Sequence, residues 1–104
     1  MRYIYLIKAE KEDVVHYKIG IAKNINKRIK ELQTGNPMKL VLINQFESEF
    51  PTLVEKTLHR KFNLFHENGE WFNLEQKDID EFINNCQKLE NDFKYLSKNN
   101  SLWN

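Results

Sequence analysis

The sequence predicts an α+β domain in which helices flank a small three-stranded antiparallel sheet, with a long helix near the C-terminal end. Two runs rich in tyrosine and isoleucine lie close together near the N-terminus, and a third apolar run follows. Apolar residues then recur at helical spacing. A chain of 104 residues is long enough for one hydrophobic core, so we expect a single domain over residues 1–98 and a tail over residues 99–104.

Three segments have the composition of β-strands. Met1–Lys8 and Val14–Ile21 are rich in β-branched and aromatic residues, and the charged segment Ala9–Asp13 between them is typical of a turn. These two strands are therefore expected to form a hairpin. Lys39–Phe46 is predominantly apolar and is expected to add the third strand.

Two helices are predicted between and after these strands. Asn24 is a favourable N-cap for the first helix, which should end near Leu32, before the helix-stopping sequence at residues 35–37. Pro51 suits the first turn of the second helix. Each helix carries an apolar stripe that should face the core: Ile25, Ile29 and Leu32 in the first, and Val54, Leu58 and Phe62 in the second.

A long helix is expected to begin near Glu75, after a turn that leads into Trp71 and Phe72. The two aromatic residues are expected to seal the core, with base stacking by Trp71 as a less favoured alternative. The apolar stripe of the helix should form either core or an interface, and it comprises Ile79, Phe82, Ile83, Cys86, Leu89, Phe93 and Leu96.

The composition narrows the class of protein without fixing it. Hydrophobic residues make up 40% of the chain and charged residues 30%, and no apolar stretch approaches the ~18 residues that a membrane span needs. Cys86 is the only cysteine, so no internal disulfide is possible, and we expect a bacterial or phage-infected cytoplasm. The net charge of +1 neither demands nor excludes a nucleic-acid partner.

Four residues of different chemistry lie on separate predicted elements: Tyr5, Lys18, Arg28 and Glu55. Phosphodiester hydrolysis needs an activated water, positive charge on the non-bridging oxygens and a metal that offsets developing negative charge. The four side chains together meet those needs with one metal ion. We therefore expect them to converge on one concave surface.

The order of these residues resembles the GIY-YIG nuclease superfamily. The first motif is Tyr3-Ile4-Tyr5, with tyrosine in place of the usual glycine, and the second is Lys18-Ile19-Gly20, with lysine in place of tyrosine. This spelling is similar to a viral and microbial branch that reads YKIG, then a helix with arginine, an E-x-x-x-H helix and finally GEWF. The resemblance extends from about Tyr3 to Leu74.

This resemblance implies a catalytic role for each of the four residues. Glu55 would bind Mg²⁺ or Mn²⁺, Arg28 would clamp the scissile phosphate, and Tyr5 with Lys18 would position or deprotonate the attacking water. Tyr17 precedes Lys18 and must point to the opposite face of the strand, so by register Lys18 occupies the catalytic position. Lys18 either acts as a base or stays charged and steadies the phosphate. We favour the second role, because we expect a wet cleft there.

Other residues are expected to support the site. Gly20 permits the strand-to-helix turn and a close approach of phosphate. His59 lies one turn after Glu55 on the same helix face, where it supports the site, contacts a phosphate or simply packs. Zinc is not expected, because no third and fourth ligand is evident. The predicted contacts with nucleic acid are Lys23, Lys27, Arg28 and Arg60.

The leading hypothesis is an endonuclease that cleaves DNA or, less favoured, RNA. A catalytically silent module that binds nucleic acid or protein with the same cleft is the alternative, and a purely structural dimer module is a third. Enzymes of this kind usually take specificity from an attached domain. We therefore expect either a homodimer through the C-terminal helix or a separate specificity protein as partner.

Overall fold

The computed structural model has the element order ββαβαββαα, and it describes residues 2–63, 66–68 and 71–99. The five strands form one antiparallel sheet in the spatial order β3-β1-β2-β5-β4. The α+β class is therefore confirmed. The three predicted strands are all present, and two short strands extend the sheet beyond them.

The hairpin forms from β1 (Arg2–Lys11) and β2 (Val14–Ala22), which pair along their whole length. β3 (Lys39–Ser48) pairs with the other side of β1, so β1 lies between β2 and β3. β5 (Trp71–Phe72) pairs with β2 at Tyr17 and Lys18, and β4 (His66–Asn68) pairs with β5. The predicted turn before Trp71 includes Gly69 and Glu70, which lie outside the described residues.

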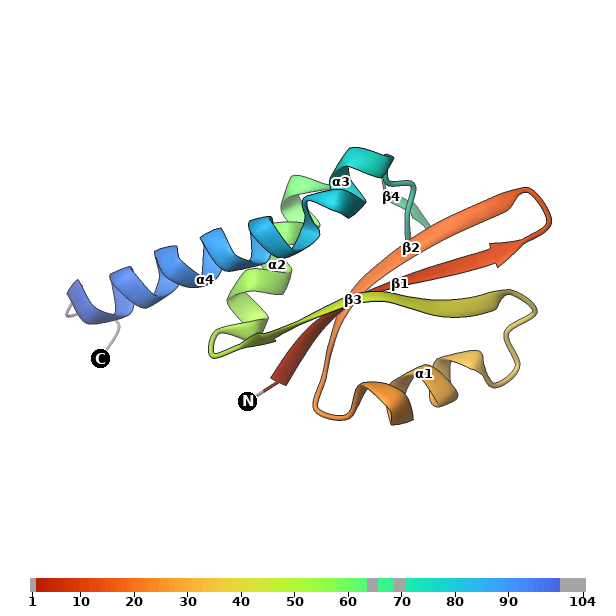
Figure 1. Cartoon of the computed structure of the whole chain (residues 1–104), viewed down its shortest axis with the longest axis horizontal. Helices are drawn as coiled ribbons and strands as arrows, with labels where there is room; N and C mark the ends of the chain where they lie inside the picture. The colour runs from red at the N-terminus through yellow and green to blue at the C-terminus, as the bar shows by residue number, and fades with distance from the viewer. Residues whose placement is uncertain (1, 64–65, 69–70, 100–104) are drawn as a thin grey trace.

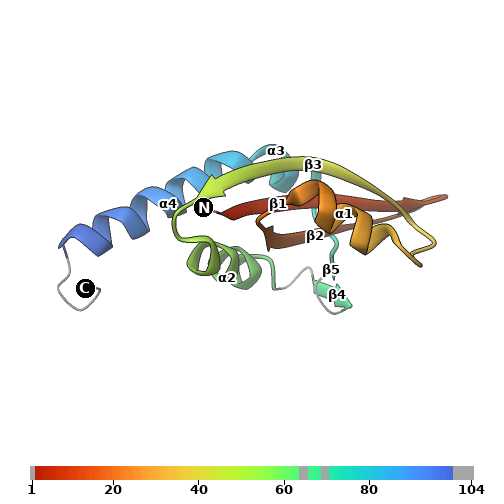
Figure 2. The same cartoon turned by 90° about the horizontal axis from the view of Figure 1, so that it is seen from below.

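Helix α1 (Ile25–Gln33) covers one face of the sheet, whereas α2 (Pro51–Lys61), α3 (Gln76–Asp80) and α4 (Phe82–Asn99) lie on the other (Figure 1). The sequence signals for α1 and α2 are confirmed. The Asn24 side chain accepts a hydrogen bond from the Lys27 backbone N–H at 3.1 Å, and Pro51 is the first residue of α2. Figure 2 shows α1 in front of the sheet when the molecule is seen from below.

Two apolar clusters hold these layers together, one on each face of β1. On the α1 face, Tyr5, Ile7 and Ala9 pack with Ile25 of the helix. On the opposite face the cluster is larger, and it contains Ile4, Leu6, Ile19, Val54, Leu58, Phe62, Phe72, Leu74, Phe82 and Cys86. Because side chains alternate along a strand, successive residues of β1 contribute to different clusters.

The predicted long C-terminal helix is confirmed as α4, but it does not begin near Glu75. Glu75 caps a short helix, α3, and accepts a capping-box bond while its own N–H bonds the Asp78 carboxylate at 3.0 Å. The chain then turns at Glu81 before α4 begins. Leu96, from the stripe predicted to form core or an interface, is 38% exposed, because the last turns of α4 extend beyond the sheet (Figure 1). α4 continues to Asn99, and the rest of the predicted tail lies outside the described residues.

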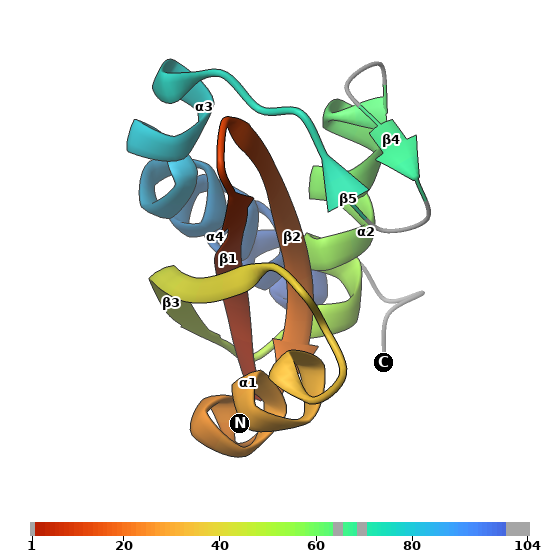
Figure 3. The same ribbon diagram turned by 90° about the vertical axis from the view of Figure 1, so that its right-hand side faces the viewer.

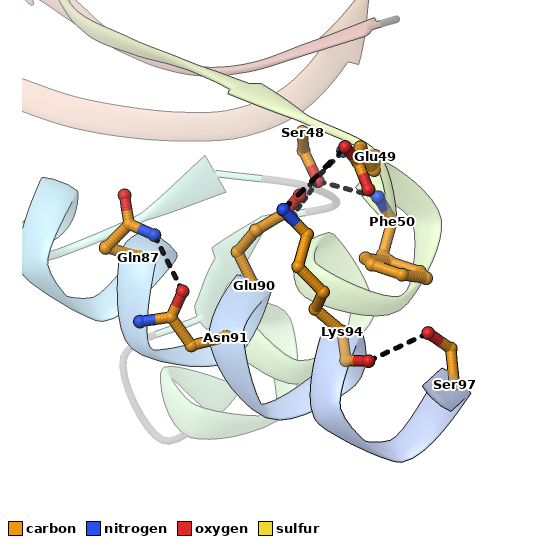
Figure 4. Close-up of polar contacts among 8 residues, drawn as sticks. All are labelled: Ser48, Glu49, Phe50, Gln87, Glu90, Asn91, Lys94 and Ser97. Carbon is orange, nitrogen blue, oxygen red and sulfur yellow. Dashed lines mark hydrogen bonds and ion pairs between the residues drawn. The ribbon is translucent and has the colours of Figure 1, made fainter. Parts of the chain in front are cut away.

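A buried carboxylate joins α4 to the end of β3 (Figure 4). Glu90, 5% exposed, accepts hydrogen bonds from the Ser48 hydroxyl at 2.6 Å and the Glu49 backbone N–H at 2.8 Å. The Phe50 backbone N–H in turn donates to the Ser48 hydroxyl oxygen at 3.0 Å. Nearer the surface, Lys94 lies 3.7 Å from the Glu49 carboxylate. The network fixes the β3–α2 junction, which sets where α2 begins.

Replacing this carboxylate should destabilise the fold. Glu90→Ala would leave the Ser48 hydroxyl and the Glu49 N–H without their buried acceptor, and each such loss costs about 1–3 kcal/mol. We expect the free energy of unfolding in urea to fall by at least that amount. Asp92→Ala, an exposed acid on the same helix, is the matched control and should change stability by less than about 0.5 kcal/mol. Equal effects of the two substitutions would contradict the role of Glu90.

Candidate functional site

The centre of the candidate site is the packing of Tyr5 against Gly20. The register of the hairpin places the two residues directly opposite each other, on the face that α1 covers. A Cβ on Gly20 would overlap the phenol oxygen and Cζ of Tyr5 and would lie 3.0 Å from Cε1. Glycine is therefore required here by close packing. The expectation that Gly20 permits a strand-to-helix turn is wrong, because β2 continues to Ala22 and the missing Cβ makes room for the Tyr5 ring.

Arg28 on α1 meets this tyrosine. A hydrogen bond with Tyr5 is the main cause that raises the pKa of the Arg28 guanidinium above its usual value. Partial burial lowers the pKa, and the charge of Glu31 adds a smaller increase. Arg28 also bonds the Glu31 carboxylate at 3.4 Å. The structure thus brings together two of the four predicted catalytic residues, Tyr5 and Arg28.

Lys18 lies on the same sheet face as Tyr5 and Gly20, but its environment differs from the one expected. The side chain is only 5% exposed, so the prediction of a wet cleft around it is wrong. Its Nζ lies 5.5 Å from the centre of the Trp71 ring, which belongs to the cluster on the α1 face. Sequence reasoning missed this, because the pairing of Lys18 with Trp71 depends on β5. The geometry is that of a cation–π interaction.

Tyr17 packs against the cluster on the opposite face, next to Phe72 of β5. The prediction that Tyr17 and Lys18 face opposite sides of the sheet is therefore confirmed. Trp71 packs against the cluster on the α1 face, and Phe72 belongs to the cluster on the opposite face. Each cluster is therefore sealed by one of the two aromatic residues.

Glu55 lies on α2, whose apolar stripe packs on the face opposite α1. The carboxylate is half-buried, beside that stripe. One turn later, His59 bonds the Ile19 carbonyl of β2 at 2.8 Å, so this side of α2 follows β2 just beyond its pairing with β5. Figure 3 shows α2 beside β2. Glu55 can approach Tyr5, Lys18 and Arg28 only around the part of β2 that lies beyond its pairing with β5. The convergence of Glu55 with Arg28 stays a prediction.

The predicted nucleic-acid contacts flank two hollows. Lys23 and Asn24 line the larger one, of about 370 Å³, together with Tyr3, which lies two residues before Tyr5 on β1. Its remaining lining residues are Ile25, Asn26, Leu42 and Gln45. Arg60 and His59 line the smaller hollow, of about 220 Å³, with Asn63 and Phe72. Lys27 is exposed on α1.

Two observations bear on metal ligands. In the described part of the chain no three or more histidine, cysteine or acidic side chains gather as a metal cluster. Burial, and to a smaller extent the charge of Glu90, raise the pKa of Cys86 to about 12, so its thiol stays protonated near neutral pH. One protein carboxylate, such as that of Glu55, is adequate for Mg²⁺, which usually keeps waters and takes its other ligands from phosphate.

These features define a small α+β domain that gathers a tyrosine, an arginine and a buried lysine on one sheet face. The family model of the T5orf172 domain matches residues 2–90, which is most of the chain. The chain belongs to this family, a GIY-YIG-like, nuclease-related family of phage domains. Neither a curated protein nor a solved structure matches the chain significantly. In the described ranges, no helix is long and apolar enough to span a membrane.

The packing of Tyr5 on Gly20 can be tested by substitution. Gly20→Ala should lower the free energy of unfolding by about 1–3 kcal/mol, because an added Cβ in a close-packed site forces its neighbours to move. In a Tyr5→Leu background the same change should cost much less, since the phenol that it overlaps is gone. Urea unfolding of the four proteins measures this coupling. Additive effects would show that the ring is not what Gly20 accommodates.

Proposed function

We propose that this domain is an endonuclease that hydrolyses phosphodiester bonds in DNA, or less favoured RNA, with one Mg²⁺ or Mn²⁺. The observation that carries the proposal is the meeting of Tyr5, Arg28 and Gly20 on one sheet face, with buried Lys18 beside them. Membership of a nuclease-related family supports it. The proposed place of action is the cytoplasm of a bacterial or phage-infected cell.

Arg28 would hold the scissile phosphate. Its contact with Glu31 is largely exposed, and such surface pairs are worth at most about 1 kcal/mol. A phosphate that takes two hydrogen bonds from the guanidinium would therefore displace Glu31 at little cost. The Tyr5 hydroxyl, held against the same guanidinium, would orient the attacking water. Lys18 would add positive charge from the floor of the site.

The half-buried carboxylate of Glu55 is the residue that would hold the metal ion. When bound, Mg²⁺ or Mn²⁺ would supply charge that offsets the negative charge developing on the phosphate and leaving oxygen. Lys23 and Arg60, at the two hollows, would contact the phosphates on either side. We propose that a second copy of the chain or a separate partner supplies sequence specificity.

A silent nucleic-acid-binding module is the second candidate. It is favoured by the lack of any cluster of three or more metal-ligating side chains in the described ranges. Incubation of the purified protein with plasmid, single-stranded DNA and RNA, each with Mg²⁺, Mn²⁺ or EDTA, separates the two candidates. Binding without cleavage under any divalent metal would establish the silent module.

The proposal predicts different effects for Glu55 and Arg28. Glu55→Ala should reduce metal-dependent cleavage at least about 100-fold while nucleic-acid binding persists, because a bare carboxylate repels phosphate. Arg28→Ala should weaken both binding and cleavage, since the guanidinium holds the phosphate in ground state and transition state alike. The controls are Glu47→Ala and Lys30→Ala, which remove exposed charges of the same sign. Cleavage by Glu55→Ala at the wild-type rate would refute its proposed role.

Two roles for Lys18, a charged group that steadies the phosphate and a general base, can be distinguished by substitution. If the ammonium stays charged and steadies the phosphate, Lys18→Arg should keep substantial activity, whereas Lys18→Met should lose about 100-fold. If Lys18 acts as a base, both variants should fail and the wild-type rate should rise with pH. Single-turnover cleavage over a pH series distinguishes these roles, with urea unfolding to verify that each variant folds. Wild-type cleavage by Lys18→Met would exclude both.

A further inference from the structure

His59 makes a hydrogen bond whose direction can be assigned. Its Nε2 lies 2.8 Å from the Ile19 carbonyl oxygen. A carbonyl only accepts hydrogen bonds, so Nε2 must carry the hydrogen and donate it. The imidazole is therefore held in the tautomer with hydrogen on Nε2, or it is doubly protonated. Either form preserves the bond to β2.

The imidazole ring is also held from a second side. Its centre lies 5.1 Å from that of the Phe72 ring, with the two planes at 79°, an edge-to-face contact. Phe72 is 1% exposed and belongs to β5, so it offers a fixed surface. Two strands, β2 and β5, thus determine the orientation of His59.

The positions of these residues connect the two halves of the candidate site. Ile19 stands in β2 between Lys18 and Gly20, the residues that form the floor of the site on the α1 face. His59 stands one turn after Glu55, on the same side of α2. The bond from His59 to Ile19 therefore links the helix that carries the carboxylate directly to the strand that carries the lysine.

We propose that His59 is a positioning residue that sets the distance of the Glu55 carboxylate from the phosphate-binding residues of β1, β2 and α1. This inference rests on the proposed function. α2 packs through an apolar stripe, which alone permits small shifts along the sheet, whereas a directed hydrogen bond fixes one position. Residues that orient a metal ligand in this way typically change metal affinity or activity 10- to 100-fold when replaced.

Two substitutions separate the hydrogen bond from the packing. His59→Phe keeps an aromatic ring against Phe72 but loses the donor, whereas His59→Gln keeps an N–H donor and loses the ring. We expect His59→Phe to weaken Mn²⁺ binding to the protein alone, followed by electron paramagnetic resonance, about 10- to 100-fold. The value of kcat on a short DNA duplex should fall similarly, with KM little changed. His59→Gln should restore most of both losses.

The outcomes are distinguishable from failure of the proposed function. If Glu55→Ala abolishes Mn²⁺ binding and His59→Phe leaves binding and kcat at the wild-type level, only the positioning role is overturned. Equal losses in His59→Phe and His59→Gln would also overturn it, because an N–H donor at position 59 would then make no difference. If Glu55→Ala binds Mn²⁺ as the wild type does, the metal site fails, and the role of His59 fails with it.

Discussion

The contact of the Tyr5 ring with Gly20 is the constraint on which the arrangement of the site depends. The pairing of β1 with β2 sets these residues opposite each other, and only the missing Cβ leaves room for the phenol. From this position the Tyr5 hydroxyl meets Arg28 on α1. The register of the hairpin thus links β1, β2 and α1 at the point where the chemistry is proposed.

The interior strand β1 explains why the site has two differently built sides. β1 is buried on both faces, so the sheet needs helices above and below it, and each face acquires its own cluster. Because side chains alternate strictly along β1 and β2, the proposed site residues of these strands lie on one face and the residues that only pack lie on the other. On β2, Lys18 and Gly20 point to the α1 face, whereas Tyr17 and Ile19 point to the face covered by α2 and α4.

Local signals in the sequence were sufficient for most of the fold. The N-cap at Asn24, the proline that opens α2 and the alternation at Tyr17 and Lys18 depend on neighbours within a few residues, and all three are confirmed. The burial of Lys18 was not predictable, because it arises from the pairing of β2 with a strand more than fifty residues later in the chain. The Glu90 network joins α4 to β3 and is likewise a tertiary contact that no local sequence pattern predicts.

The charges on the α1 face give a physical reason for the site to attract an anion. Lys18 on β2 is buried, and Arg28 on α1 is partly buried. Both lie on the side of the sheet where Tyr5 packs against Gly20. The Trp71 ring lies beside Lys18 and the exposed carboxylate of Glu31 beside Arg28, and each contact lowers the free-energy cost of burying a cationic group. A phosphate group would compensate both cations at once. Because such a ligand would bind the folded chain alone, it would also stabilise the fold.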